Sequence, residues 1–385
     1  MELQALAEVI DQLCDADPAA WAGDGDAVVT LHRLSTRLES IVTGAVAAFE
    51  ASGTWSADGA RSATAWINTR CRTHPGHTGR LARRGRALRE MPAAAEAFGG
   101  GEITGDHVDA LVRIRNPRTR GCFERDEEQL VAYAKELKFP EFLRTLAYWE
   151  QFADPDGTEA AAERRRSRRD VILSESIGGM WLGKITLDPV SGTIVHNELD
   201  RIEQAMFEAD WAEATERLGH VPTVADLRRT PADRRADALA EMAVRSASCP
   251  DGARRPRPLF SVLVDYPTLH GRLCQLARGT VVTPGSLVPW LEAADIERAV
   301  FTPGGRVEVG HTTRLFTGAT RRAIELRDRE CTHPYCDEPA ERCQVDHILE
   351  YRNGGLTTQA NGRMLCAFHN RLRNYERPPP DDDTG

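Results

Sequence analysis

The chain has 385 residues, 28% of them charged, with a formal net charge of −9. This length exceeds what one hydrophobic core usually fills, so we expect more than one domain. The negative charge excludes a protein that binds polyanions over its whole surface, because phosphate affinity requires clustered lysine and arginine. The absence of a long apolar run excludes a transmembrane helix.

The N-terminal segment, residues 1–28, is predicted to be a short amphipathic helix over Leu3–Cys14 followed by a mobile acidic connection. The residues up to Trp21 include acidic side chains but no lysine or arginine, unlike a secretory signal peptide. We therefore expect a cytoplasmic protein with no membrane partner.

Residues 29–316 are predicted to form a mainly helical domain, because apolar residues recur at helical spacing. The expected helices cover Leu31–Ala51, a segment starting near Ser62, Thr78–Met91, Gly105–Arg115, Glu124–Leu137 and Pro140–Phe152. The helix over Thr78–Met91 follows a Pro-Gly turn and carries five arginines. It is either the second helix of a helix-turn-helix DNA reader or a bundle helix with a solvated arginine face.

The segment Asp154–Arg169 is polar and ends in a run rich in arginine, which indicates a surface linker or a phosphate-contacting patch. Beyond it, alternating apolar residues predict strands and a hairpin, followed by a return to helix and then a buried strand. The predicted strands are Val171–Leu173, Trp181–Leu187, Thr193–Val195 after a turn at Asp188–Gly192, Leu259–Val264, and Ala299–Val309 with a fold-back at Pro303–Gly305; the helices are Leu199–Ala214 and Arg234–Arg245. The predicted fold class is α+β, with a mainly α-helical upstream domain and a small mixed β portion.

Four of the nine cysteines lie in one short C-terminal segment together with three histidines. In a reducing cytoplasm such clustering indicates a metal rather than disulfides. Two close pairs, Cys331 with Cys336 and Cys366 with His369, supply three thiolates and an imidazole, which is a closed tetrahedral set for structural Zn²⁺. Cys343 and His333 are alternatives that could replace a member of this set.

The same segment has residues suited to phosphodiester hydrolysis, which needs a base for water and a Lewis acid for the phosphate. His347 is the candidate general base, Asp346 is a hard oxygen ligand for Mg²⁺ or Mn²⁺, and Asn370 follows His369 on a predicted helix. Neighbours on a regular strand point to opposite faces, so Asp346 and His347 share a site only if the strand ends or bulges there. Asn361 follows a Gly-Gly loop and is expected to hold the imidazole ring of His347.

The segment Cys331–Arg373 resembles the HNH endonuclease family in its Cys-x4-Cys, Asp-His, Gly-Gly, Asn and Cys-x2-His elements. The resemblance implies a ββα-metal (His-Me finger) nuclease module over residues 317–377 that hydrolyses DNA, with a structural zinc. It implies that His347 is the base, Asn361 the central Asn, and Asp346 and Asn370 the ligands of a catalytic Mg²⁺ or Mn²⁺. Asn370 stands where the family usually has a histidine, which affects metal preference.

The upstream residues, about His32 to Phe316, resemble the domain of unknown function 222 that precedes such nucleases in the 13E12 repeat family. The matching features are Asp58–Ser62, the arginine-rich segment Leu81–Leu88, Gly101–Thr104 and Arg314–Phe316. The leading hypothesis is a metal-dependent DNA endonuclease whose upstream domain positions the substrate. The alternatives are a catalytically weak or inactive zinc-stabilised DNA-binding protein and a protein-interaction scaffold. Residues 378–385 are expected to be a disordered tail.

Overall fold

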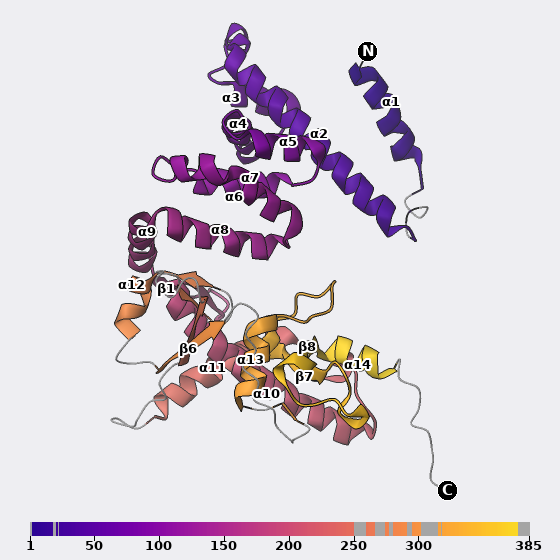
Figure 1. The fold of residues 1–385 in the computed structure, drawn as a ribbon, viewed down its shortest axis with the longest axis vertical. Coiled ribbons are helices and arrows are strands. Elements are labelled where there is room, and N and C mark those ends of the chain that lie inside the picture. Colours follow the sequence, from indigo (N-terminus) through magenta and orange to yellow (C-terminus); the bar gives the residue numbers. More distant parts are fainter. Residues whose placement is uncertain are drawn as a thin grey trace. The chain divides into compact units, whose positions relative to one another are not determined.

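The computed structural model describes residues 2–17, 21, 23–249, 259–265, 274–276, 280–290, 295–301, 315–316 and 318–375. The chain divides into two compact units, Met1–Asp154 (unit 1) and Pro155–Gly385 (unit 2). Among the described residues, unit 1 is helical throughout and every strand lies in unit 2 (Figure 1). The structure is therefore mainly helical with a small β portion, as predicted. The predicted fold-back at Pro303–Gly305 and the predicted tail fall outside the described residues.

Unit 1 is built from helices around an apolar core. The helices are α1 (Glu2–Asp15), α2 (Gly25–Ser52), α3 (Ala63–Cys71), α4 (Pro75–Leu88), α5 (Pro92–Gly100), α6 (Gly105–Ile114), α7 (Arg120–Glu136) and α8 (Phe139–Ala153). Met91, Phe98, Leu111, Phe123 and Phe142 are fully buried in the core. All the helices predicted for this unit are confirmed, with ends shifted by a few residues.

Helix α5 was not predicted, because its glycine-rich end resembles a loop in the sequence. Pro92 occupies the first turn of α5, where its missing N–H costs nothing. Gly101 ends the helix in the left-handed conformation at φ 71°, which an alanine would adopt only with strain. The Gly-Gly-Gly run is thus a helix end and cap, and the chain continues directly into α6.

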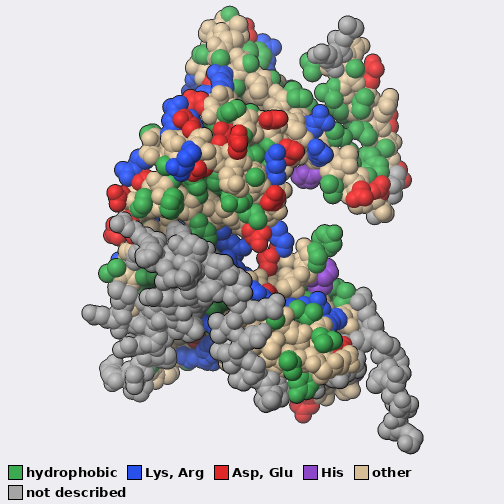
Figure 2. Space-filling view, in the orientation of Figure 1, with side chains coloured by type: hydrophobic (Ala, Val, Ile, Leu, Met, Phe, Trp, Pro, Cys, Tyr) green, Lys and Arg blue, Asp and Glu red, His purple; other side chains and the backbone are tan. Residues whose placement is uncertain are grey.

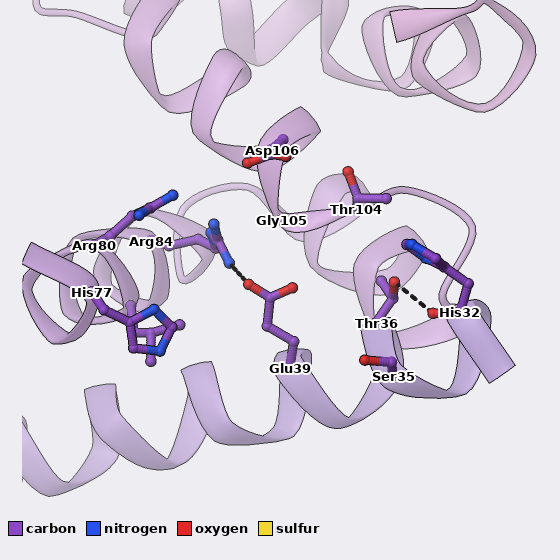
Figure 3. A pocket seen from close by; sticks show the side chains of 11 residues that line it. His32, Ser35, Thr36, Glu39, His77, Arg80, Arg84, Thr104, Gly105 and Asp106 are labelled. Atoms are coloured by element: carbon purple, nitrogen blue, oxygen red, sulfur yellow. Dashed lines mark hydrogen bonds and ion pairs between the residues drawn. The ribbon is translucent and has the colours of Figure 1, made fainter. Parts of the chain in front are cut away.

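Helix α4 belongs to the bundle: one of its arginines, Arg84, is buried within unit 1, and Arg80, Arg83 and Arg86 are exposed. The side chain of Arg84 is 2% exposed and forms ion pairs with Glu39 of α2 and Asp109 of α6. Arg86 pairs with Glu50, and Arg89 donates to the backbone carbonyl of Ala47. Figure 3 shows Arg84 pointing between α2 and α6 at the floor of a polar cavity of about 230 Å³. These contacts favour the bundle helix over the helix-turn-helix alternative.

In its described residues, unit 2 combines helices with four two-stranded sheets. Its helices are α9 (Pro155–Ser167), α10 (Pro189–Leu218), α11 (Pro231–Ala247), α12 (Pro284–Leu287), α13 (Gly318–Asp328) and α14 (Ala367–Tyr375). Its strands are β1 (Asp170–Glu175), β2 (Trp181–Thr186), β3 (Leu259–Asp265), β4 (Cys274–Gln275), β5 (Val281–Val282), β6 (Asp295–Phe301), β7 (Cys343–His347) and β8 (Gly362–Cys366). The pairs β1–β2, β4–β5 and β7–β8 are antiparallel, and β3–β6 is parallel.

One prediction in unit 2 is wrong, and a second segment has structure that was not predicted. The segment expected to be a surface linker or a phosphate-contacting patch is mostly helix α9, because Pro155 fits the first turn and alanine, glutamate and arginine favour helix. The turn and strand expected at Asp188–Val195 are the start of α10: Asp188 accepts hydrogen bonds from the Val190 and Ser191 N–H groups as an N-cap. Val190 is fully buried beside the partly buried Ile194, so packing outweighs the strand preference of these residues.

No described helix is both long enough and apolar enough to cross a membrane.

Candidate metal centre

The C-terminal part of unit 2 is a hairpin followed by a helix. Strands β7 and β8 pair antiparallel, with Cys343 opposite Cys366 and His347 opposite Gly362, and α14 begins directly after β8. Helix α13 packs on β8 through the fully buried Ile324. A side chain at Gly362 would collide with Ile324, so glycine permits this close packing. The buried cluster around the hairpin is small, which is the situation in which a bound metal contributes folding free energy.

Cys331, Cys336, Cys366 and His369 form one cluster whose donor atoms all lie within 4.8 Å of one another. The Nδ1 atom of His369 is 3.5 Å from Cys331 Sγ and 3.3 Å from Cys366 Sγ, and Cys336 Sγ is 3.9 Å from Cys366 Sγ. Tetrahedral zinc with Zn–S of about 2.3 Å and Zn–N of about 2.0 Å implies edges of about 3.8 Å and 3.5 Å. The four donors therefore fit a single zinc ion and could hold it.

The pKa values of two thiols in the cluster shift in opposite directions. Burial raises the pKa of Cys331, but the N–H groups of Cys366 and His333 and the neighbouring thiols outweigh it, so this pKa lies below its ordinary value. Burial raises the pKa of Cys336 to about 11. A thiolate is the metal-binding form of cysteine, so binding at Cys336 releases a proton.

The two alternative ligands lie beside the cluster. Cys343 is 3% exposed, burial raises the pKa of its thiol, and its Sγ contacts the Glu338 carbonyl at 3.5 Å. The ring of His333 stacks on that of His369, with centroids 3.8 Å apart and planes 8° apart. Cys343 is therefore a buried core residue outside the cluster. His333 packs against the ligand His369 and is not itself one of the four ligands.

His347 is the last residue of β7 and faces the loop after the strand. Its Nε2 atom is 3.1 Å from the Thr357 hydroxyl, and its ring lies 4.3 Å from that of Phe316 and 5.8 Å from that of Tyr351. Thr357 is 1% exposed, so this hydrogen bond is shielded from water. The imidazole is thus held by an aromatic neighbour on one side and a buried hydroxyl on the other.

Asn361 does not hold the imidazole ring, contrary to expectation. Its amide nitrogen donates to the carbonyls of Leu349 and Leu356, and its oxygen accepts from the Leu349 N–H. These bonds close the loop that contains Gly354 and Gly355. Asn361 therefore positions Thr357 through the loop backbone, and Thr357 contacts His347.

Asp346 and Asn370 lie on the α14 side of the hairpin, while His347 faces the loop. The Asp346 carboxylate is paired with Arg373 of α14 and lies 3.6 Å from Arg363. Arg373 also donates to the carbonyl of His347, at 2.6 Å. The Asn370 amide donates to Gln344 at 2.7 Å. Asp346 and His347 are successive residues of the regularly paired strand β7, so the end of the strand does not turn their side chains to one face, although Arg373 contacts both residues.

Thr357 and Phe316 are site residues that the spacing of the motif did not reveal. Thr357 follows the Gly-Gly-Leu stretch, and only the closed loop brings its hydroxyl to His347. Phe316 lies before α13, far from the motif in sequence, and reaches His347 by packing. Arg373 lies almost one helical turn beyond Asn370, so its contact with Asp346 depends on how α14 packs on β7.

Comparison with known proteins identifies relatives without an assigned activity. An uncharacterized protein of Mycobacterium tuberculosis strain CDC 1551 is 26% identical over 306 residues, which covers 74% of this chain and 64% of that protein. A second, from M. tuberculosis strain H37Rv, is 22% identical over 338 residues, covering 75% and 60%. A third, from Mycobacterium bovis, is 26% identical over 306 residues, covering 74% and 64%. The chain spans about three fifths of the length of these relatives. No solved structure matches.

A family model, that of the domain of unknown function DUF222, matches residues 26–328. The match begins within α2, includes the rest of unit 1, and ends before the first cysteine of the metal cluster. Because the match covers well over half of the chain, this protein belongs to the DUF222 family.

Proposed function

We propose that this protein is a metal-dependent DNA endonuclease of the HNH type, which hydrolyses phosphodiester bonds at the β7–β8–α14 segment. The observation that supports it best is the order of elements around the zinc-fitting cluster: a hairpin whose first strand ends at His347, then a helix that carries His369 and Asn370. A cluster that closes all four zinc positions is structural, so the chemistry belongs to the neighbouring polar residues. We further propose that the DUF222 region positions the DNA.

In this proposal His347 takes a proton from the attacking water. Its Nε2 atom contacts the Thr357 hydroxyl, which orients the ring. A general base must first be correctly oriented, and only then does its pKa determine how well it works. A bound Mg²⁺ or Mn²⁺ would supply the positive charge that stabilises the phosphate. Asp346 and the amide oxygen of Asn370 are the groups that would hold it. Asp346 already lies beside two guanidinium groups, so a cation there has to compete with Arg373.

The first prediction concerns His347. We expect His347→Ala to abolish nicking of supercoiled plasmid in the presence of Mg²⁺ or Mn²⁺, because the base is removed while the four zinc-fitting residues stay. The assay compares zinc-loaded protein with and without added divalent metal, which avoids the zinc loss that a strong chelator would cause. His220→Ala, the same change at an exposed histidine of unit 2, is the matched control and should cut like the wild type. Wild-type cleavage by the His347→Ala variant would contradict the assignment.

The second candidate function is a DNA-binding protein with weak or no catalysis. The observation that favours it is that Asp346 is occupied by arginines and the Asn370 amide is engaged with Gln344. This candidate predicts salt-sensitive DNA binding by folded, zinc-loaded protein that does not nick plasmid with Mg²⁺, Mn²⁺ or Ni²⁺. The endonuclease proposal predicts nicking with at least one of these ions.

The second prediction concerns Thr357. We expect Thr357→Val to lower the cleavage rate by about 10- to 100-fold, because valine keeps the volume but loses the hydroxyl that orients the base. Thr357→Ser keeps the hydroxyl and should restore most of the rate. The measurement is single-turnover cleavage with zinc content determined in parallel. Equal rates for the valine and serine variants would show that the hydroxyl does not position His347.

A further inference from the structure

The sequence run Arg164 to Arg169 lies where α9 ends, and its contacts differ from those of other arginines in unit 2. Arg164, Arg165, Arg166 and Arg168, the arginine cluster, make no side-chain hydrogen bond or ion pair within the part of the chain that the structure describes. Three of the four are exposed and Arg166 is half-buried. Elsewhere in unit 2, Arg201, Arg228 and Arg245 are 50–70% exposed and each pairs with a glutamate.

Positively and negatively charged side chains are mixed on the visible face of unit 1. Figure 2 shows lysine and arginine side chains interspersed with aspartate and glutamate there, consistent with ion pairs such as Arg86–Glu50 and Arg120–Glu124. An arginine whose charge is neutralised by a carboxylate releases few counterions on meeting DNA. In a chain of net charge −9, only a local group of unneutralised arginines can act as a phosphate-binding surface.

The acidic residues of helix α9, Asp156, Glu159 and Glu163, all precede its arginines, and Glu163 is the one next to the arginine cluster. Glu159, in its first half, accepts from the Thr283 hydroxyl at 2.7 Å and from the Gly285 N–H at 2.9 Å, so this carboxylate is committed to the start of α12. Arg164 and Arg165 lie in the last turn, where the negative end of the helix dipole stabilises positive charge. Like charges this close still repel one another, by a few tenths of a kcal/mol per pair. The cluster therefore carries an excess of positive charge that no ion pair in the described residues neutralises.

The exposed members of the cluster are close together along the chain. Arg164 and Arg165 lie in the last turn of α9, and Arg168 follows the helix in a turn in which its backbone N–H donates to the Arg165 carbonyl at 3.2 Å. The planar, multiply donating guanidinium group binds phosphate oxygens in a forked geometry that lysine cannot match. A compact, exposed row of such groups fits a polyanion that presents successive phosphates.

We propose that the arginine cluster at the end of α9 is a contact surface of the DUF222 region for the phosphate backbone of duplex DNA. It provides affinity and orientation independent of base sequence, as backbone contacts do. This inference rests on the proposed function, because it assumes that DNA is the substrate. It gives the DUF222 region a task in that function: to hold the duplex while the C-terminal module cuts it.

The test compares two triple variants in full-length, zinc-loaded His347→Ala protein, so that DNA is bound without being cut. One carries Arg164→Gln, Arg165→Gln and Arg168→Gln; the control carries Arg201→Gln, Arg228→Gln and Arg245→Gln. Both remove the same charge from unit 2, but the control removes arginines already paired with glutamates. Fluorescence anisotropy with a short duplex of mixed sequence gives Kd over a range of salt concentrations, and thermal unfolding checks that both variants fold.

We expect the slope of log Kd against log salt to fall by about 2 to 3 in the cluster variant, at about 0.9 per lost phosphate contact, and to change little in the control. The loss should be the same for duplexes of different sequence. Equal losses in both variants, an unchanged slope in the cluster variant, or no DNA binding by the parent protein would each overturn the inference. An unchanged slope would make an acidic protein surface the next partner to test.

Plasmid nicking by the wild type is scored separately. Cluster-dependent binding without any nicking would support this inference while the endonuclease proposal fails.

Discussion

Replacing Cys331 with serine is expected to unfold the C-terminal module and to remove its zinc. Cys331 is 1% exposed and lies within contact distance of His369 and of the backbone N–H of Cys366, so it joins both halves of the cluster. Structural zinc contributes on the order of 10 kcal/mol in modules of this size, more than the small core around Ile324 and Met364 offers alone. The loss should therefore affect the whole β7–β8–α14 segment.

The measurements are zinc content per chain and hydrogen exchange over residues 318–375. We expect bound zinc to be lost and exchange to become fast in this segment, while amides of unit 1 keep their protection. Cys343→Ala is the matched control: it changes a cysteine of the same core that is 3% exposed but lies outside the cluster. It should keep its zinc and cost only about 1 kcal/mol. Zinc retained by Cys331→Ser, or lost from Cys343→Ala, would contradict the ligand set.

The zinc-fitting set could be predicted from the sequence because each half of it is local. Cys331 and Cys336 are brought together by a tight turn, and Cys366 and His369 by the first turn of α14. Only the meeting of the two pairs needs tertiary structure, and a hydrogen bond from the Thr332 N–H to the Met364 carbonyl of β8, at 2.8 Å, holds the Cys331–Cys336 turn there. The sequence could not decide between these residues and Cys343, because the burial of Cys343 follows from the packing of the hairpin against α13.

The surroundings of His347 could not be predicted, because they depend on the path of a loop. Asn361 and Thr357 are both polar residues after the Gly-Gly stretch, and either could reach the ring in an open loop. The loop closes through Asn361 itself, which commits that amide and leaves the Thr357 hydroxyl at the ring. The function proposed for His347 stays the same when Thr357 rather than Asn361 is its partner. The residue whose mutation tests the orientation of the ring is therefore Thr357.

The wrong prediction at Asp188–Val195 also arises because contacts between distant residues decide the structure there. An Asp-Pro pair opens tight turns as well as helices, and the β-branched residues after Asp188 favour strand, so local preference predicted a hairpin there. What decides the outcome is burial: Val190 packs against the buried Leu276 and Val282, residues far away in sequence. Helix periodicity in unit 1 was easier to use, because long amphipathic helices carry a repeated signal.

Replacing Arg84 with methionine is expected to destabilise unit 1 by about 2 to 3 kcal/mol, because it removes charge-assisted hydrogen bonds to two carboxylates whose side chains are 39% and 24% exposed. Arg84 donates from Nε and Nη2 to the two carboxylate oxygens of Asp109, at 3.0 and 2.9 Å, and from Nη1 to Glu39. Its guanidinium also lies over the ring of Phe98, at 5.6 Å from the centroid. One side chain thus connects α2, α4, α5 and α6, as Figure 3 shows for its contact with Glu39.

A substitution at Gly105, which lies against the Arg84 guanidinium, is a second test of the Arg84 ion pairs. A Cβ atom at this position would overlap the Arg84 guanidinium, so Gly105→Ala should destabilise unit 1 as well, by displacing Arg84 from its carboxylates. Arg84→Lys should recover only part of the loss, since an ammonium group cannot bind Asp109 through two parallel hydrogen bonds. Arg83→Met, the same change at the exposed neighbour, is the control and should lie within about 0.5 kcal/mol of the wild type.

Hydrogen exchange of the amides in α4 and α6, followed as urea is added to the full-length chain, reports the stability of unit 1 separately from that of unit 2. The opening free energy of these amides should fall in the order wild type, Arg84→Lys, Arg84→Met. If Arg84→Met exchanges like Arg83→Met, the ion pairs of Arg84 contribute no net stability, and apolar packing around Phe98 and Leu111 holds the four helices together. If it falls as expected, the ion pairs of Arg84 stabilise unit 1, and this buried guanidinium is a structural group that is not available to bind DNA.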